Sequence, residues 1–294
     1  GGAALAASLD GDDNTAIGFE TLAFYEGTDN AGDNTAVGSV ALRACTTGGT
    51  NTAIGSRALT AITTGAENVS IGFQSAQAFS NAETGNISIG ANAMNSFNEG
   101  GDGGDINYNI ALGLEAFLGG SLAGGTTDVI GNIAIGAYAL DATSTNAHTG
   151  TIAIGHQALT ACTSGSGNIA VGYQAGMAAT DNLRNTVIGH GAYRYSTSSD
   201  DNVVIGFNAL RNAGSAGAGS DKNIAIGSYA LDAADGGEND NIAIGYDAMG
   251  NANNSSTEFN IAIGNYTLDA IAGNLQTGTI AIGHNSLTAL TSGA

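Results

Sequence analysis

The hydrophobic and polar positions of this chain recur every 17 to 23 residues around one phrase, which reads Asn-Thr-Ala-Ile-Gly at residues 51–55. We call the closing glycine of each copy the marker glycine. Self-similarity at so short a period is typical of repeat proteins, in which each unit forms one turn, or rung, of a stacked array. The sequence therefore predicts a solenoid of fifteen rungs with marker glycines at Gly18, Gly38, Gly55, Gly72, Gly90, Gly113, Gly136, Gly155, Gly172, Gly189, Gly206, Gly227, Gly245, Gly264 and Gly283.

Four columns of equivalent residues precede the marker glycine. The isoleucine column, one residue before it, holds Ile, Val or Leu, and the β-branched column lies three residues before it. The alanine column, two residues before, holds Ala, Ser or Val, and the asparagine column lies four residues before. Alternating β-branched and aliphatic residues favour a strand, whose successive side chains point to opposite faces. We expect the two apolar columns inside the coil and the alanine and asparagine columns on the other face.

Asparagine occupies the asparagine column in thirteen of the fifteen copies, and Thr151 and Thr279 are the exceptions. Stacked asparagines are predicted to join neighbouring rungs through their side-chain amides, so we assign them to the scaffold. The thirteen residues of this predicted ladder are Asn14, Asn34, Asn51, Asn68, Asn86, Asn109, Asn132, Asn168, Asn185, Asn202, Asn223, Asn241 and Asn260.

The second half of each repeat has a small residue three positions after the marker glycine and a large one, usually Leu, four positions after it. This predicts a second short strand or a corner whose large residue fills the interior. Extra length falls between this corner and the next asparagine, which places variable loops along one edge, where repeat proteins often carry recognition. Cys45 and Cys162 occupy equivalent places seven rungs apart, so we expect them to be buried and unable to pair within one chain.

The domain organisation predicted is a lead-in over residues 1–13 and one continuous all-β solenoid over residues 14–294, part of a longer fibre. A single rung inserts few large side chains, so burial barely balances the entropy of ordering its backbone. Small residues allow a neighbouring chain to approach closely. We therefore expect a parallel homotrimer with Ala16, Ala36, Ala53 and their equivalents near the subunit contacts.

Charge narrows the classes of partner. The chain has 6 basic and 26 acidic residues, a net charge of −20 and no basic patch, which excludes nucleic acid and disfavours anionic membranes. The lead-in is too short for a membrane span and has no basic start typical of a signal peptide.

Aromatic residues directly follow several marker glycines, and we propose them as candidates for surface binding: Phe19, Phe73, Tyr173, Phe207 and Tyr246. His156, His190 and His284 occupy the same place, so planar packing is the favoured role for this column. Three copies of one histidine around a threefold axis are the alternative, as a metal site. His148 is expected to be exposed in a turn.

The remaining candidate chemistry is sparse. Residues 100–105 read Gly-Gly-Asp-Gly-Gly-Asp and echo the calcium-binding turns of other β-rolls, with Asp102 and Asp105 as candidate ligands. The motif occurs once, so a solvated loop is favoured, as it is for the acidic loop over residues 232–240. No serine, histidine and carboxylate share a catalytic spacing, and we expect neither enzymatic activity nor a cofactor.

The phrases NTAIGSRAL, NIAIGAYAL and NIAVGYQAG resemble the repeats of trimeric autotransporter adhesin heads (the YadA-like left-handed β-roll) and, more closely, related repeats of bacteriophage tail fibres. The resemblance covers residues 14–290. It implies a trimeric, elongated fibre on a virion or bacterial cell surface, which positions or mediates attachment to a host, and no enzymatic activity.

Three functions therefore remain: a fibre shaft or adhesin that contacts a cell-surface receptor or glycan, a self-assembling structural filament, and an ice-binding surface protein. The third needs an outward-facing row of threonines, and the β-branched column, which is mostly Ile and Val, is expected to face inward.

Overall fold

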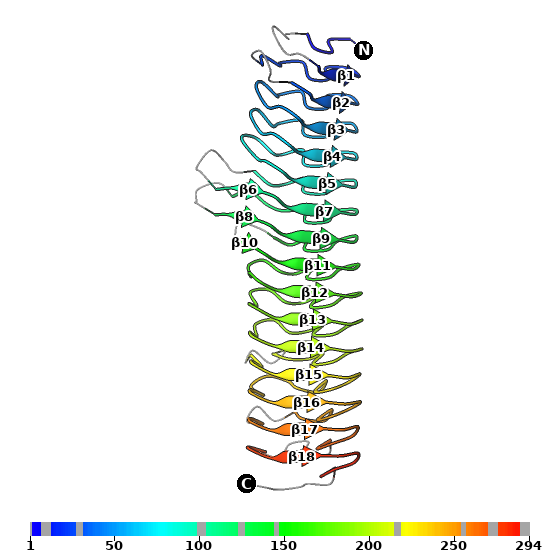
Figure 1. The fold of residues 1–294 in the computed structure, drawn as a ribbon, viewed down its shortest axis with the longest axis vertical. Coiled ribbons are helices and arrows are strands. Elements are labelled where there is room, and N and C mark those ends of the chain that lie inside the picture. The colour runs from blue at the N-terminus through cyan, green and yellow to red at the C-terminus, as the bar shows by residue number, and fades with distance from the viewer. Residues whose placement is uncertain are drawn as a thin grey trace. The chain divides into compact units, whose positions relative to one another are not determined.

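The computed structural model describes residues 2–6, 13–27, 32–98, 104–122, 127–143, 147–214, 219–253, 257–269 and 276–288. The chain divides into two compact units, Gly1–Gly150 (unit 1) and Thr151–Ala294 (unit 2). The described residues form short strands, turns and bends, and none is helical. Within each unit every coil of the chain contributes one strand to a parallel sheet (Figure 1). The predicted all-β solenoid is therefore confirmed.

The strands of each sheet follow one another in sequence order. Unit 1 contains β1 (Thr15–Ile17), β2 (Thr35–Val37), β3 (Thr52–Ile54), β4 (Val69–Ile71), β5 (Ile87–Ile89), β7 (Ile110–Leu112) and β9 (Ile133–Ile135). Unit 2 contains β11 (Ile152–Ile154), β12 (Ile169–Val171), β13 (Thr186–Ile188), β14 (Val203–Ile205), β15 (Ile224–Ile226), β16 (Ile242–Ile244), β17 (Ile261–Ile263) and β18 (Ile280–Ile282). A second, small sheet in unit 1 has the order β10 (His148–Thr149), β8 (Val129–Ile130), β6 (Ile106–Asn107).

Neighbouring strands pair in register, so each residue lies beside its equivalent from the next repeat. Ala36 of β2 pairs with Ala16 of β1 and with Ala53 of β3, and the isoleucine and β-branched columns align in the same way. The columns read from the sequence are thus continuous ladders within each unit.

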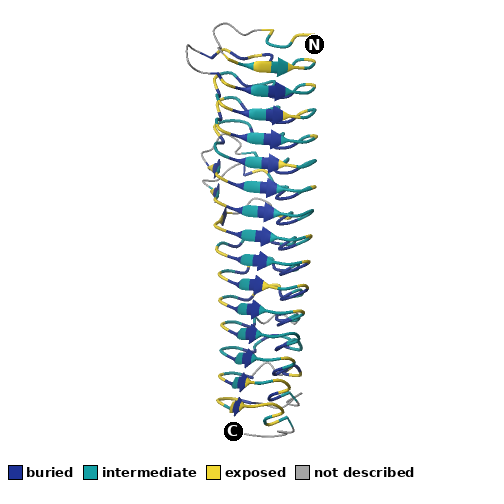
Figure 2. Ribbon diagram, turned by 45° about the vertical axis from the view of Figure 1, so that its right-hand side comes forward, coloured by how far each residue is buried: buried dark blue, intermediate teal, exposed yellow. Residues whose placement is uncertain are grey.

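The predicted orientation of the strands is wrong. Ala53 is 0% exposed within its own coil, whereas Ile54 beside it is 39% exposed. In nearly every strand the middle residue is buried and its two neighbours are half-buried or exposed (Figure 2). The alanine and asparagine columns therefore face the interior, and the isoleucine and β-branched columns face outward. Buried in this way, Ala36 and Ala53 are not available for the predicted subunit contacts.

The reason is that the interior between the strand and the corner is only two small side chains thick. Ser70, in the alanine column, donates a hydrogen bond of 2.8 Å from its hydroxyl to the carbonyl oxygen of Ser75, three positions after the marker glycine. The Ser75 and Ser88 hydroxyl oxygens lie 2.7 Å apart. An isoleucine column would not fit between positions that approach so closely.

Each repeat turns back at a corner made of two residues with left-handed backbone. Arg57 (φ 62°) and Leu59 (φ 47°) illustrate the pattern. Leu59 is fully buried, which confirms that the large residue of the corner fills the interior, and the corner is a turn rather than a second strand. Residues 2–6 form an equivalent turn, with positive φ at Ala3 and Leu5 and a hydrogen bond from Leu5 N–H to Thr21 O of 3.1 Å.

The two cysteines and His148 are all buried. Cys45 and Cys162 are both buried free thiols, and burial raises their pKa to about 11 and about 12. His148 is 0% exposed and belongs to β10, so the expectation of an exposed turn histidine is wrong. Its backbone carbonyl accepts a hydrogen bond of 2.8 Å from the Asn132 amide, which holds this stretch against the rung before it.

Candidate functional site

The asparagine ladder runs through the interior of both units. The Asn34 side-chain oxygen accepts hydrogen bonds from the backbone N–H (2.9 Å) and the side-chain amide (3.2 Å) of Asn51. The Asn51 amide also donates to the carbonyl oxygen of Gly65, at 2.9 Å. Asn68 repeats the pattern on Asn51. Each buried asparagine thus joins two rungs, which makes the ladder part of the scaffold and leaves it no access to a ligand.

The marker glycines stack where two backbones approach closely. Gly55 has φ +139°, and a Cβ atom built there would overlap the carbonyl oxygen of Gly72 in the next rung. Only glycine combines this backbone conformation with such an approach. The column is therefore a packing requirement and not a phosphate-binding loop.

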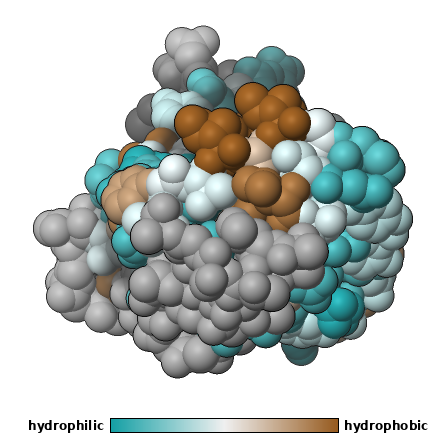
Figure 3. Space-filling model, turned by 90° about the horizontal axis from the view of Figure 1, so that it is seen from below, coloured by the Kyte–Doolittle hydropathy of each residue, from teal (hydrophilic) through white to brown (hydrophobic). Residues whose placement is uncertain are grey.

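The outward-facing columns form a continuous apolar surface on each unit, which we call the isoleucine face. Every residue of the isoleucine column is half-buried or exposed: Ile17, Val37, Ile54, Ile71, Ile89, Leu112 and Ile135 in unit 1, and Ile154, Val171, Ile188, Ile205, Ile226, Ile244, Ile263 and Ile282 in unit 2. Seen from below, hydrophobic side chains gather in the upper middle of the view, beside hydrophilic ones (Figure 3). A parallel sheet normally has both faces covered, so this face is the principal candidate for an interaction surface.

The aromatic residues predicted to bind at the surface are exposed. Phe19, Phe73, Tyr173, Phe207 and Tyr246 have between 41% and 56% of their surface accessible. Phe19 and Phe73 of unit 1 lie three rungs apart with Ser39 and Ser56 between them, so the structure does not bring these two together.

In unit 2 the rings form one uninterrupted row, which we call the aromatic row. Tyr173 stacks between His156 and His190, with ring centroids 5.4 and 4.8 Å away. The further contacts are mostly edge-to-face, at 5.3 to 6.1 Å, and run through Phe207, Tyr229, Tyr246, Tyr266 and His284. Planar packing is therefore found only among His156, Tyr173 and His190, and the rest of the row is tilted or edge-to-face. Tyr229 and Tyr266 were not predicted as members of the row, because they lie two residues after their marker glycines and not one.

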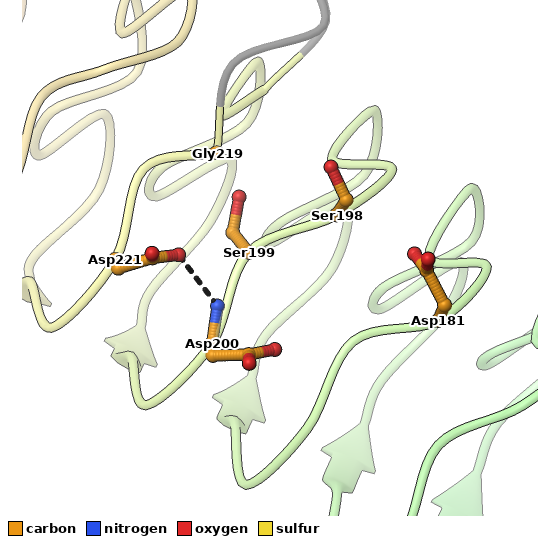
Figure 4. A pocket seen from close by; sticks show the side chains of 6 residues that line it. All are labelled: Asp181, Ser198, Ser199, Asp200, Gly219 and Asp221. Atoms are coloured by element: carbon orange, nitrogen blue, oxygen red, sulfur yellow. Dashed lines mark hydrogen bonds between the residues drawn. The ribbon is translucent and has the colours of Figure 1, made fainter.

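A pocket lies at the loop edge of unit 2, and its lining includes three carboxylates and two hydroxyls (Figure 4). The residues are Asp181, Ser198, Ser199, Asp200, Gly219 and Asp221.

The hydrogen bonds of the pocket carboxylates explain their presence without a ligand. Asp221 accepts a hydrogen bond of 2.8 Å from the backbone N–H of Asp200, and Asp200 accepts one of the same length from the N–H of Leu183. Asp200 and Asp221 therefore each hold the rung before them. Arg184 pairs with Asp201 beside the pocket through two bonds of 2.6 and 2.9 Å.

The calcium candidates receive no support from the described residues. Asp102 lies outside them, and Asp105 donates its N–H to Asp128, at 3.2 Å, in the same rung-to-rung manner. No group of three or more His, Cys, Asp or Glu side chains in the described part of the chain is arranged to hold a metal ion.

Asp232 and Glu238 in unit 2 both have a raised pKa. Burial, and then the nearby Asp247 carboxylate, raise the pKa of Asp232 to about 6. Burial is also the main cause that raises the pKa of Glu238, against hydrogen bonds from Gly236 and Ser220. Both lie within the acidic loop noted in the sequence.

No family model, curated protein or solved structure matches this chain. A search of the described residues for a helix of the length and apolarity needed to cross a membrane finds none.

Proposed function

We propose that this chain is the repeat segment of an extracellular or virion-borne fibre, which associates with copies of itself through the isoleucine face and presents its loops and aromatic row for attachment to a host or another surface. The proposal assigns no catalytic activity and no cofactor to the segment. A parallel homotrimer and a left-handed coil are part of it, and both derive from the resemblance to adhesin heads and phage fibres.

The observation that carries the proposal is the uncovered isoleucine face. Its two columns contain only Ile, Val, Leu and Thr, although the chain has 32 charged residues, 26 acidic and 6 basic. Apolar surface with charge excluded from its centre is typical of stable contacts between protein chains. Parallel copies would also bring equivalent columns to the same height. This assignment replaces the alanine column as the expected contact.

The aromatic row supports attachment as the outward role of unit 2. Exposed tyrosine and phenylalanine side chains are enriched at contact surfaces, because each combines a large apolar area with little rotamer entropy. Amide side chains accompany the row, such as Gln157 and Gln174, which are joined by a hydrogen bond of 2.7 Å. Rings beside amides suit a protein receptor or a neutral glycan.

Self-association tests the isoleucine face. We expect light scattering on the purified chain to give the mass of three copies, and Ile54→Glu to lower that mass, because a charge would be desolvated in the contact. Thr64→Glu is the matched control, since Thr64 is exposed on a turn of the same rung and outside the isoleucine face. A stable wild-type monomer would remove the trimer, and open-ended polymers in negative stain would favour the filament.

Attachment is tested separately on a glycan and receptor array. We expect Tyr173→Ala and Tyr246→Ala to weaken the binding of any captured ligand while the oligomeric mass stays unchanged. Binding by both variants as tight as that of the wild-type chain would exclude the aromatic row from attachment.

One observation favours ice binding, because the β-branched column faces outward. Thr15, Thr35 and Thr52 lie side by side on the outward face, contrary to the expectation that this column points inward. The row ends at Val69 of the next strand, so the regular surface is only three residues long and the fibre is the better-supported function. A freezing-hysteresis assay separates the two.

A further inference from the structure

Unit 2 contains a buried polar column that the proposed function does not use. Its members lie three residues before the asparagine column, and we call them the inner polar column: Asn182, Ser199, Ser220, Glu238, Thr257 and Gln276. Each is at most 2% exposed. The asparagine ladder fixes their backbones, as when the amides of Asn241 and Asn260 donate to the carbonyls of Thr257 and Gln276 at 2.8 and 3.0 Å.

Direct hydrogen bonds link three consecutive members of the column, Ser199, Ser220 and Glu238. The Ser199 hydroxyl accepts the backbone N–H of Ser220 at 2.9 Å, and the Ser220 hydroxyl donates to Glu238 Oε2 at 3.0 Å. Glu238 Oε2 also accepts the N–H of Gly236 at 2.9 Å. These contacts position the Glu238 carboxyl group without using its second oxygen.

The second half of the column has no such links. Glu238 Oε1, Thr257 Oγ1 and both side-chain polar atoms of Gln276 are buried and have no hydrogen-bond partner among the residues that the structure describes. Buried polar groups in folded proteins are almost always paired with protein or ordered water. Three consecutive members with unpaired atoms therefore indicate a missing partner.

The spacing of the rungs is compatible with water as that partner. Asn239, Glu258 and Thr277 pair as consecutive parallel bridges, so the residues directly before them, Glu238, Thr257 and Gln276, lie on adjacent rungs. Adjacent rungs are ~4.8 Å apart, so two side chains bond directly only where they lean toward each other, as Ser220 and Glu238 do at 3.0 Å. Between groups that do not meet in this way, one water molecule fits at ~2.8 Å from each. We infer that unit 2 binds a single file of ordered water molecules that joins Glu238 Oε1, Thr257 Oγ1 and the Gln276 amide.

Water fits this set better than a cation. The Gln276 Nε2 group is an unpaired donor, and a cation offers it no acceptor, whereas water both donates and accepts. A single carboxylate, a hydroxyl and an amide spread over three rungs also make a poor metal site, in agreement with the absence of a metal-binding group among the described residues.

Unit 1 supplies two internal comparisons. Glu83 occupies the position equivalent to Glu238, but both of its oxygens accept backbone N–H groups, from Ser80 at 2.8 Å and from Asn81 at 3.0 Å. It therefore needs no water. Ile106 and Val129 occupy the same column and are fully buried, so the fold accepts an apolar side chain here.

A crystal structure of the full chain, at a resolution that shows ordered water, tests the inference directly. We expect density within hydrogen-bond distance of Glu238 Oε1, Thr257 Oγ1 and the Gln276 amide, and none beside the Glu83 carboxyl group. Direct side-chain contacts without density between the rungs would overturn the inference. So would a peak with the short oxygen distances of a bound cation.

Thermal unfolding of Thr257→Val gives an independent measurement. In a hydrated column the variant loses a water bridge, so its melting temperature should fall below that of the wild-type chain. In a dry column the same change removes an unpaired hydroxyl and should raise or preserve the melting temperature, which would contradict the inference. The Val129→Ile control enlarges an apolar member of the equivalent column in unit 1, and its crystal structure should leave the density around Thr257 unchanged.

Discussion

Each asparagine of the ladder serves two rungs, because its amide group donates in one direction and its side-chain oxygen accepts from the other. Removing the Asn51 side chain takes away the acceptor of the Asn68 N–H and the side-chain donor of the Gly65 carbonyl, whereas the Asn68 amide keeps its bonds to Ala66 and Glu83. Unpaired buried groups of this kind destabilise by ~1–3 kcal/mol each.

We therefore expect Asn51→Ala to lower the free energy of unfolding by about 2–4 kcal/mol. Asn51→Thr should be milder, since Thr151 occupies the same column and its hydroxyl donates to the Gly165 carbonyl at 3.0 Å. Guanidinium unfolding of both variants measures the difference, and equal losses would mean that a hydrogen bond to the Gly65 carbonyl contributes nothing measurable.

The marker glycine gives a second prediction at the residue scale. Gly55→Ala combines an unfavourable φ of +139° with overlap on the Gly72 carbonyl oxygen, so we expect a loss of about 3 kcal/mol or more. Gly131→Ala is the matched control, because its φ is +68° and a Cβ atom there meets nothing within 4 Å. The control should lose only about 1 kcal/mol, from backbone strain alone. Similar losses in the two variants would contradict a role for close packing between rungs.

At the scale of the strand, orientation follows from the thickness of the coil. The interior holds the alanine column against the small residues of the corner, and the larger aliphatic side chains remain outside. The order of burial is therefore the reverse of what hydrophobicity alone would choose.

Exchanging single strand residues for leucine tests this orientation. Ala53→Leu forces three extra carbon atoms into a filled interior and should destabilise by about 1–3 kcal/mol or more. Ile54→Leu on the outward face conserves volume and should change stability by less than about 1 kcal/mol. Chemical unfolding at matched protein concentration compares the two, and a larger loss for Ile54→Leu would restore the inward orientation that the sequence suggested.

The corner of unit 2 carries a pH dependence. The pKa of Asp232 rises to about 6 mainly because burial penalises the charged form, so protonation favours the folded state. The resulting stabilisation is complete below about pH 4 and is lost as the pH rises through about 6. We expect the melting temperature to fall over this interval and the slope to flatten in Asp232→Asn, which does not titrate. An unchanged slope in the variant would assign the dependence to other carboxylates.

For the whole molecule, the isoleucine face and the charge distribution act together. The net charge of −20 lies outside the isoleucine and β-branched columns, so two chains can meet on an apolar surface while their loops repel one another. Salt screens repulsion between exposed charges but leaves apolar burial intact. Self-association measured by light scattering should therefore strengthen between low and physiological ionic strength, and weakening would indicate an electrostatic contact instead.

The sequence by itself determined the repeat, the strand in each copy, the buried corner residue and the positions of the asparagine ladder. These follow from short-range regularities: a period, an alternation, and one residue type in one column. The aromatic residues after the marker glycines were also visible, although the row in unit 2 was incomplete because Tyr229 and Tyr266 shift by one position.

Only the tertiary structure decided which face of each strand is inside and which buried polar groups lack partners among the described residues of unit 2. Alternation separates two faces but does not say which of them is enclosed, and that depends on how closely the corner approaches the strand. The small residues three positions after the marker glycine were the available signal, since only a small column can lie opposite another at the distance between Ser75 and Ser88. The inner polar column is equally a product of stacking, because its residues become neighbours only when successive rungs lie side by side.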